Sequence, residues 1–271
     1  MIKIKPFIRN VAILVAFLFV YYIFNIMKYL IIPDVHGRSF WETPVCDLLK
    51  EDDVKIIFLG DYLDPYPNEW KNDNYQIIAL DNFNKILSLK KKYMDKIILL
   101  IGNHDAEYMY GKSVCNCRCD NINYDKIKTL FIDNKDLFKI CHEEYINGKR
   151  YIFSHAGILE KWANEWFENY NAETFIDGLN EKFKDSMNDK EPESTEFCEA
   201  LSVIDYKRGG WNTYGSLIWG DVRLFKPFLG YQIFGHTQLV KEFIHGEFAC
   251  LDARKAFIID ENGNLNAIRE K

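Results

Sequence analysis

The sequence predicts an α/β fold, because short apolar runs of strand length alternate with amphipathic stretches of helix length in its first half. Its second half carries the signals of β-hairpins, among them Asn147-Gly148 between two strand-like runs. The length of 271 residues is enough for one large domain with a sizeable buried core. We therefore expect a single α/β domain over residues 27–271, preceded by an apolar segment at residues 1–26.

The first half has a strand–helix–strand–helix–strand order. Strands are predicted at residues 28–32, 54–60 and 96–102, and helices near residues 39–51 and 74–93. Each strand is a continuous apolar run that ends in a polar loop before the next helix begins. Such strands are typical of a sheet that is covered on both faces.

The second half combines hairpin strands with a helical insertion. Strands are predicted on either side of residues 147–148, in the run that ends at Gly235, and within residues 243–252 and 256–268. Residues 158–210 are instead polar and aromatic with a helical pattern, and they are predicted to form a cap-like insertion near the site.

The N-terminal segment has two interpretations. Residues 11–26 form an uninterrupted apolar run behind basic residues, which is typical of a membrane anchor of about 20 residues, here through residues 7–26. However, the strand predicted at residues 28–32 follows without a linker, and a membrane helix cannot lead directly into a buried strand. The alternative is an over-extended start, with Met27 as the initiator and a cytoplasmic protein.

Composition limits the classes of partner. The formal charge of −6 argues against a nucleic acid, although it does not exclude a phosphorylated substrate if bound cations reverse the local field. Seven scattered cysteines in a chain of this size indicate a reduced, cytosolic compartment. Cys115, Cys117 and Cys119 are spaced C-x-C-x-C, which fits neither a zinc knuckle nor a redox pair, so they are interpreted as a loop cluster or as a structural metal or thiol group.

Polar motifs follow the ends of five predicted strands. They are Asp34-Val35-His36-Gly37, Gly60-Asp61-Tyr62-Leu63-Asp64, Gly102-Asn103-His104-Asp105, Ser154-His155-Ala156-Gly157 and Gly235-His236-Thr237. Because the carboxyl ends of strands in open α/β sheets line one crevice, the five loops are expected to converge. Oxygen and imidazole ligands without thiolates suit Mn, Fe, Zn, Ni or Co.

This ordered set resembles the calcineurin-like metallophosphoesterases, and especially their phosphoprotein-phosphatase branch, with its D-x-H, G-D-x-x-D, G-N-H-[DE], H and G-H blocks. The resemblance extends over about residues 28–260 and includes Leu217-Ile218-Trp219-Gly220-Asp221, which is similar to the Leu-Leu-Trp-x-Asp segment of that branch. It implies a four-layer α/β/β/α sandwich of two mixed sheets flanked by helices.

The resemblance also implies the roles of the site residues. The implied ligands of two divalent metal ions, with manganese as the first choice, are Asp34, His36, Asp61, Asn103, His155 and His236. Asp61 would bridge the two ions, and His104, oriented by Asp64, would be the acid that protonates the leaving oxygen. Asp105 is interpreted as a helix N-cap rather than a ligand.

The chemistry of such a site follows from its charges. Two divalent ions carry four positive charges, and Asp34 and Asp61 return only two negative ones, so the site attracts phosphate. Ions about 3.5–4 Å apart lower the pKa of a bound water to about 7 and clamp phosphoryl oxygens during in-line attack. Direct attack of the resulting hydroxide is expected, without a covalent phosphoenzyme.

One block departs from the family pattern. The branch carries Arg-Gly after G-D-x-x-D, where the arginine grips phosphate, whereas Pro65-Tyr66 stands here. The candidate replacements are Arg223 as the first choice, then Arg38, Arg118 and Arg208.

The predicted function is hydrolysis of a phosphomonoester or phosphoanhydride on a protein or small molecule, with a phosphoprotein phosphatase as one form. The alternatives are a phosphodiesterase or dinucleoside-polyphosphate hydrolase and, in another class, a catalytically silent metal-binding interaction scaffold. Because His104 and all the implied ligands are present, the sequence favours an enzyme.

Overall fold

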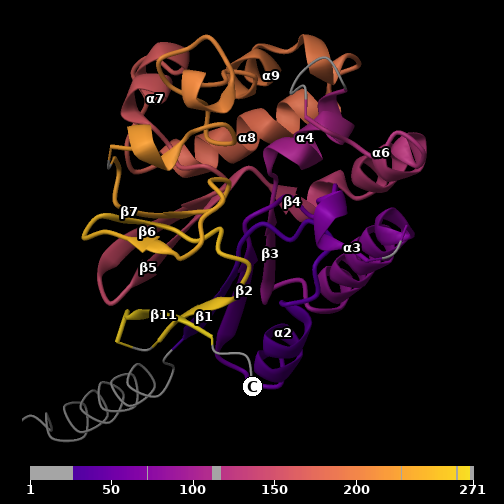
Figure 1. The fold of residues 1–271 in the computed structure, drawn as a ribbon. Coiled ribbons are helices and arrows are strands. Elements are labelled where there is room, and N and C mark those ends of the chain that lie inside the picture. The colour runs from indigo at the N-terminus through magenta and orange to yellow at the C-terminus, as the bar shows by residue number, and fades with distance from the viewer. Residues whose placement is uncertain (1–26, 72, 112–116, 227, 261, 269–271) are drawn as a thin grey trace, which may run out of the picture.

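Two mixed β-sheets lie face to face between helices in the computed structural model (Figure 1), which describes residues 27–268 apart from residues 72, 112–116, 227 and 261. The apolar segment 1–26 and Cys115 lie outside the described residues. Within the described part of the chain, no helix combines the length and the apolar character that crossing a bilayer requires.

The first sheet contains the strands predicted in the first half of the chain. Its order is β11 (Leu265–Ala267), β10 (Phe257–Ile259), β1 (Lys28–Ile32), β2 (Val54–Phe58), β3 (Ile97–Leu100) and β4 (Phe138–Lys139). Strands β1 to β4 pair in parallel, and β10 pairs with β1 in the antiparallel direction. The parallel strands therefore end at the same edge of the sheet.

The second sheet contains the predicted hairpin. Its order is β5 (Cys141–Ile146), β6 (Lys149–Ser154), β7 (Tyr231–Phe234), β9 (Phe248–Cys250) and β8 (Phe243–Ile244). Asn147 and Gly148 connect β5 to β6 with φ angles of 51° and 75°, as a tight hairpin turn requires. Strands β6, β7 and β9 are parallel, so β6 and β7 also end at a common edge.

Alternation along β1 explains how the two sheets stack. Tyr29 and Ile31 belong to a buried cluster that also contains Phe153 and Ile233 of the second sheet, so this cluster fills the space between the sheets. Leu30 and the other alternate residues of β1 belong to the cluster under the helices. Because side chains along a strand point alternately to its two faces, one short apolar strand contributes to both apolar layers.

Helices cover the outer faces of both sheets. The α-helices are α2 (Glu42–Leu48), α3 (Tyr75–Lys92), α4 (Asn103–Tyr110), α6 (Tyr124–Asp133), α7 (Glu160–Trp166), α8 (Phe175–Asn188) and α9 (Glu196–Leu201). Short 3-10 helices in the connections are η1 (Pro67–Glu69), η2 (Lys135–Leu137), η3 (Pro192–Ser194), η4 (Tyr206–Arg208) and η5 (Val222–Leu224). In Figure 1, α2 and α3 lie beside β1–β3, and α7, α8 and α9 are grouped beside the second sheet. The predicted four-layer sandwich is confirmed.

Helices also form within the predicted insertion at residues 158–210. Helix α8 is tied to the second sheet, because Asn180 accepts a hydrogen bond from the Ile140 amide (3.1 Å) and donates one to the Cys141 carbonyl (3.0 Å). The indole of Trp162 in α7 donates to the carbonyl of Ala200 in α9 at 2.8 Å. The three helices therefore form one packed unit against β5.

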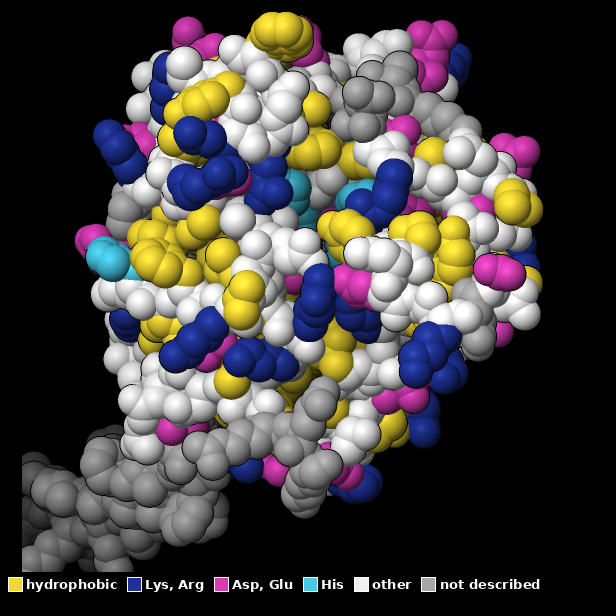
Figure 2. Space-filling model, viewed as in Figure 1, with side chains coloured by type: hydrophobic (Ala, Val, Ile, Leu, Met, Phe, Trp, Pro, Cys, Tyr) yellow, Lys and Arg dark blue, Asp and Glu magenta, His cyan; other side chains and the backbone are white. Residues whose placement is uncertain are grey.

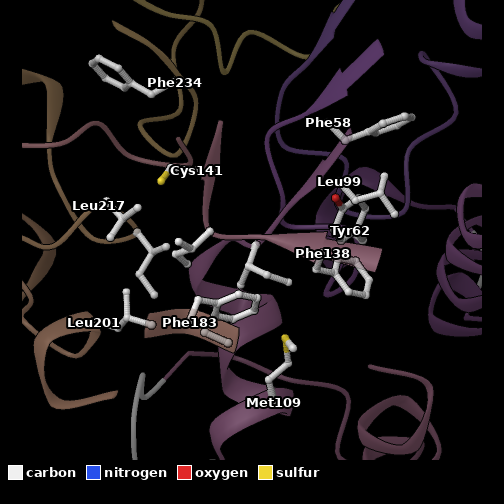
Figure 3. Close-up of a cluster of buried hydrophobic side chains, with 14 of the residues drawn as sticks. Phe58, Tyr62, Leu99, Met109, Phe138, Cys141, Phe183, Leu201, Leu217 and Phe234 are labelled. Carbon is white, nitrogen blue, oxygen red and sulfur yellow. The ribbon is translucent and has the colours of Figure 1, made fainter. Parts of the chain in front are cut away.

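One apolar core joins the two halves of the chain. Figure 3 shows Phe58 and Leu99, from the first sheet, and Leu217 and Phe234, from the second half, within the same buried cluster, with Phe138 among them. Burying a side chain of this size contributes about 1.5–3 kcal/mol relative to leaving it exposed. This core fixes the strand ends of both sheets relative to each other.

Candidate active site

The loops that follow five strands meet where the two sheets adjoin. Ligand atoms of His36, Asp61 and His104 lie within 4.8 Å of one another, and so do those of Asp61, His155 and His236. Asp61 is common to both groups. In Figure 2, histidine side chains are visible in a hollow of the surface, with Lys and Arg side chains beside it.

One half of the site brings together carboxylate and amide oxygens and histidine ring nitrogens. The Nδ1 atom of His155 donates to the Leu59 carbonyl at 2.9 Å, so Nε2 of the neutral ring carries a lone pair. This Nε2 lies 3.0 Å from Oδ1 of Asn103, 3.1 Å from Nδ1 of His236 and 3.5 Å from Oδ2 of Asp61. A set of oxygen and imidazole acceptors that face one another fits a divalent cation.

The other half is built around His36. Its Nδ1 atom donates to the Leu63 carbonyl at 2.9 Å, which directs Nε2 towards Oδ2 of Asp61 at 3.5 Å. Asp34, the remaining implied ligand, accepts hydrogen bonds from the backbone N–H of His236, 2.9 and 3.2 Å from its two carboxylate oxygens. The first and last motifs of the sequence are therefore in direct contact, although Asp34 is outside the two groups of close ligand atoms.

The protonation states of the site suit a metal. Burial, with the positive charges of His104 and Arg38, holds the pKa of His36 well below its usual value, and burial with the charge of Arg208 does the same to His236. Both rings are therefore neutral at physiological pH, as metal binding requires. Burial raises the pKa of Asp61 well above its usual range, with Asp34 adding to the effect, so its carboxylate needs a cation nearby.

His104 and Asp64 form the predicted pair. Nδ1 of His104 lies 2.9 Å from Oδ2 of Asp64, and both side chains are buried. Burial alone would lower the pKa of His104, but the charges of Asp61 and Asp64 and the Asp64 hydrogen bond outweigh it and raise the pKa. The ring therefore favours the protonated state that a general acid needs.

Two residues absent from the sequence prediction hold Asp64 in place. The hydroxyl of Tyr108 donates to Oδ1 of Asp64 at 2.5 Å, and the amide of Asp120 donates to the same atom at 3.1 Å. Tyr108 lies one helical turn after His104 on α4, and this spacing is the sequence signal that could have identified it. No comparable signal points to Asp120, whose backbone makes the contact.

Asp105 is not the N-cap of helix α4, contrary to the sequence prediction: Gly102 is the N-cap, and Asp105 caps the helix from its third position. Its carboxylate accepts from the amides of Gly102 (2.9 Å), Asp61 (2.7 Å) and Tyr62 (3.1 Å). Burial raises its pKa to about 6, although these three hydrogen bonds work in the opposite direction. Asp105 thus joins the loops that follow β2 and β3.

The arginines proposed to bind substrate occupy different surroundings. Arg118 stacks on Tyr66, with its guanidinium carbon 3.7 Å from the ring centroid, and donates to the Asp64 carbonyl at 2.8 Å. The positive charge of Arg118 also contributes to the lowered pKa of His36 and works against the raised pKa of His104.

The other arginines are paired with carboxylates. Arg38 donates to Glu69 at 2.8 Å, and Arg223, the first choice from the sequence, forms a two-point pair with Asp221 at 2.7 and 2.8 Å. Arg208 lies 3.0 Å from Asp221 and also donates to Thr237 at 2.6 Å and to the His236 carbonyl at 3.2 Å. Arg208 therefore connects Asp221, and with it the Trp219-Gly220-Asp221 segment, to the loop that carries His236.

A two-sheet sandwich with buried aspartates, histidines and an asparagine at its strand ends fits the class of metal-dependent hydrolases. Residues 27–239 match the calcineurin-like phosphoesterase family, and the chain belongs to this family. It is a metallophosphoesterase, an enzyme that hydrolyses phosphate esters.

Solved structures show the same fold. A cold-active protein-tyrosine phosphatase of a psychrophile, Shewanella sp., is 16% identical, with a TM-score of 0.54 over 90% of this chain and 80% of that chain. A second structure of a cold-active protein tyrosine phosphatase is 17% identical, with a TM-score of 0.53 over 90% of this chain and 79% of that chain. At these identities the likeness supports the fold.

Proposed function

We propose that this protein hydrolyses phosphomonoesters or phosphoanhydrides of a protein or small molecule, with a phosphoprotein phosphatase as one form. The observation that carries the proposal is the position of His104. Its ring lies within the cluster of His36 and Asp61, yet its Nδ1 atom is committed to Asp64. This arrangement suits a proton donor beside a metal centre rather than one more ligand.

The acceptor atoms described above would hold two divalent ions, with manganese as the first choice. Asp34 and His36 would bind the first ion, Asp61 would bridge, and the second would take its ligands from Asn103, His155 and His236. Ions in these positions would supply an activated water nucleophile and polarise the phosphoryl oxygens. The backbone N–H of His104 donates a hydrogen bond to Oδ1 of Asp61 at 3.0 Å, and this bond would keep the bridging carboxylate oriented.

Protein groups would perform the remaining steps. Asp64 would hold His104 through Nδ1, so that Nε2 is the atom that delivers a proton to the leaving oxygen. Arg118 would bind a phosphoryl oxygen, held over the ring of Tyr66, because Pro65-Tyr66 stands in this chain where the family carries its phosphate-binding Arg-Gly.

The test is metal analysis followed by assays of wild type and His104→Ala on p-nitrophenyl phosphate and bis-p-nitrophenyl phosphate with Mn²⁺. We expect two ions in both proteins, preference for the monoester, and a fall in turnover of at least about two orders of magnitude in His104→Ala. Preference for the bis-ester would point to a phosphodiesterase. Two bound ions without any turnover would indicate a scaffold.

A further inference from the structure

Cys117, in the cysteine-rich segment after α4, contacts Asn103, which is one of the proposed metal ligands. Nδ2 of Asn103 donates to Sγ of Cys117 at 3.1 Å, and this thiol donates to the Asn103 carbonyl, 3.5 Å away. The Cys117 amide donates to Glu107 of the same helix at 3.4 Å. The sulfur therefore lies on the side of the Asn103 amide group opposite His155.

Without a metal ion, the side-chain amide of Asn103 would be more stable in the opposite orientation. Oδ1 of Asn103 faces Nε2 of His155 at 3.0 Å, and in a neutral His155 ring, whose Nδ1 donates to the Leu59 carbonyl, both of these atoms are acceptors. Rotating the amide by half a turn would replace this contact with an N–H···N hydrogen bond, which is worth about 0.5–1.5 kcal/mol. Without a cation, the rotated amide would block the second metal position with its N–H group.

Cys117 opposes this rotation from a fixed position. Its thiol proton is directed to a carbonyl, which leaves the sulfur lone pairs to accept the Asn103 N–H. The next residue, Arg118, is held by the Asp64 carbonyl, and the amide of Asp120 is held by the Asp64 carboxylate. The segment 117–120 is thus attached to the site at three points.

We propose that Cys117 is a positioning residue for the second metal ion, because its sulfur holds the side-chain amide of Asn103 with Oδ1 directed at the ion. The inference rests on the proposed function, since it takes Asn103 as a ligand. It also gives one cysteine of the C-x-C-x-C cluster a role without making the sulfur a metal ligand.

The test titrates chelator-treated protein with Mn²⁺ and measures both the number of ions and their affinities by calorimetry. In Cys117→Ala we expect one of the two sites to weaken by about 10-fold or more, as for other groups that orient a ligand, with the other site unchanged. Cys117→Ser, which keeps an acceptor, should recover most of the affinity. The matched control is Cys119→Ala, because the Cys119 thiol is directed to Asn121, 3.7 Å away, and this variant should bind as wild type does.

A double-mutant cycle distinguishes an effect of Cys117 on the orientation of the Asn103 amide from a general effect on the structure of the site. Asn103→Asp has two equivalent oxygens and no N–H to hold, so adding Cys117→Ala should cost no further affinity in that background. An equal loss in both backgrounds, a loss at both sites, or wild-type affinities in Cys117→Ala would each overturn the inference. If wild type itself binds no ion, it is the proposed function that fails.

Discussion

Four residues of the candidate site adopt a backbone conformation that side chains disfavour. The φ angles of His36, Asp61, Asp64 and His236 are 44°, 53°, 57° and 61°, although none of these residues is glycine. Such conformations cost about 1–3 kcal/mol each and persist where the surrounding structure enforces them. Each one lies in a loop that turns sharply at the end of a strand, so packing and hydrogen bonds elsewhere in the fold maintain the geometry of the site.

Arg118 should contribute more to substrate binding than Arg223 does. A charge-assisted hydrogen bond is worth about 1.5–3 kcal/mol, so Arg118→Ala should lower kcat/KM for p-nitrophenyl phosphate about 10-fold or more, mainly through KM. Arg223→Ala should have the smaller effect, because Nε and Nη2 of that guanidinium are both bound to the Asp221 carboxylate. Steady-state kinetics of the two variants make the comparison, and a larger loss in Arg223→Ala would reverse the assignment.

The strand-end loops of the site are packed so closely that only glycine fits at certain positions. A Cβ atom on Gly235 would lie 2.1 Å from Oδ1 of Asp34, and one on Gly102 would lie 2.2 Å from Oδ1 of Asp61. Each glycine thus lets a loop from one strand approach the carboxylate that follows another. The glycines are part of the site even though they offer no ligand atom.

Gly235→Ala should therefore impair metal binding before it impairs folding. The methyl group would displace the Asp34 carboxylate, and we expect calorimetric Mn²⁺ affinity to fall by at least about 10-fold, as when other groups beside a ligand are changed. The control is Gly178→Ala in α8, where an added Cβ meets nothing within 4 Å. That variant should raise the free energy of unfolding by about 0.5–1 kcal/mol and leave the metal affinity unchanged. Unchanged affinity in Gly235→Ala would show that Asp34 does not bind an ion.

Elements with a strong local pattern were predictable from the sequence, whereas contacts between loops were not. The strand predicted at residues 28–32 has the same bounds as β1, because a short apolar run that ends in a polar loop is typical of a buried parallel strand. The stacking of Arg118 on Tyr66 joins residues 52 positions apart, and it depends on loop conformations that no periodicity records. For the same reason the sequence favoured Arg223, whose pairing with Asp221 only the structure shows.

At the scale of the whole molecule, the site joins the two sheets. Asp61 and Asn103 follow strands of the first sheet, and His155 and His236 follow strands of the second. The proposed ions would therefore act as a cross-link between the sheets as well as catalytic groups. Without the ions, the negative charges of the buried carboxylates Asp34, Asp61 and Asp252 would repel one another with few positive charges to offset them.

Chelation should destabilise the protein, and increasingly so as the pH rises from about 6.5 to about 8. In the metal-free state burial raises the pKa of Asp61 and Asp252, with Asp34 adding to both, so the folded chain binds more protons than the unfolded one and stability falls as pH rises. The raised pKa of His104 acts in the same direction, whereas the lowered pKa values of His36 and His236 oppose it only in the lower part of this range, where the unfolded chain still protonates these rings in part. Ions at 100 times their dissociation constant would add about 2.7 kcal/mol of stability.

Thermal unfolding with and without chelator should thus show a gap in Tm that widens with pH. In Asp61→Asn, which lacks the buried charge, the chelated protein should unfold at a higher Tm than chelated wild type and respond less to pH and to added Mn²⁺. Equal Tm values with and without chelator across this range would mean that no ion joins the sheets.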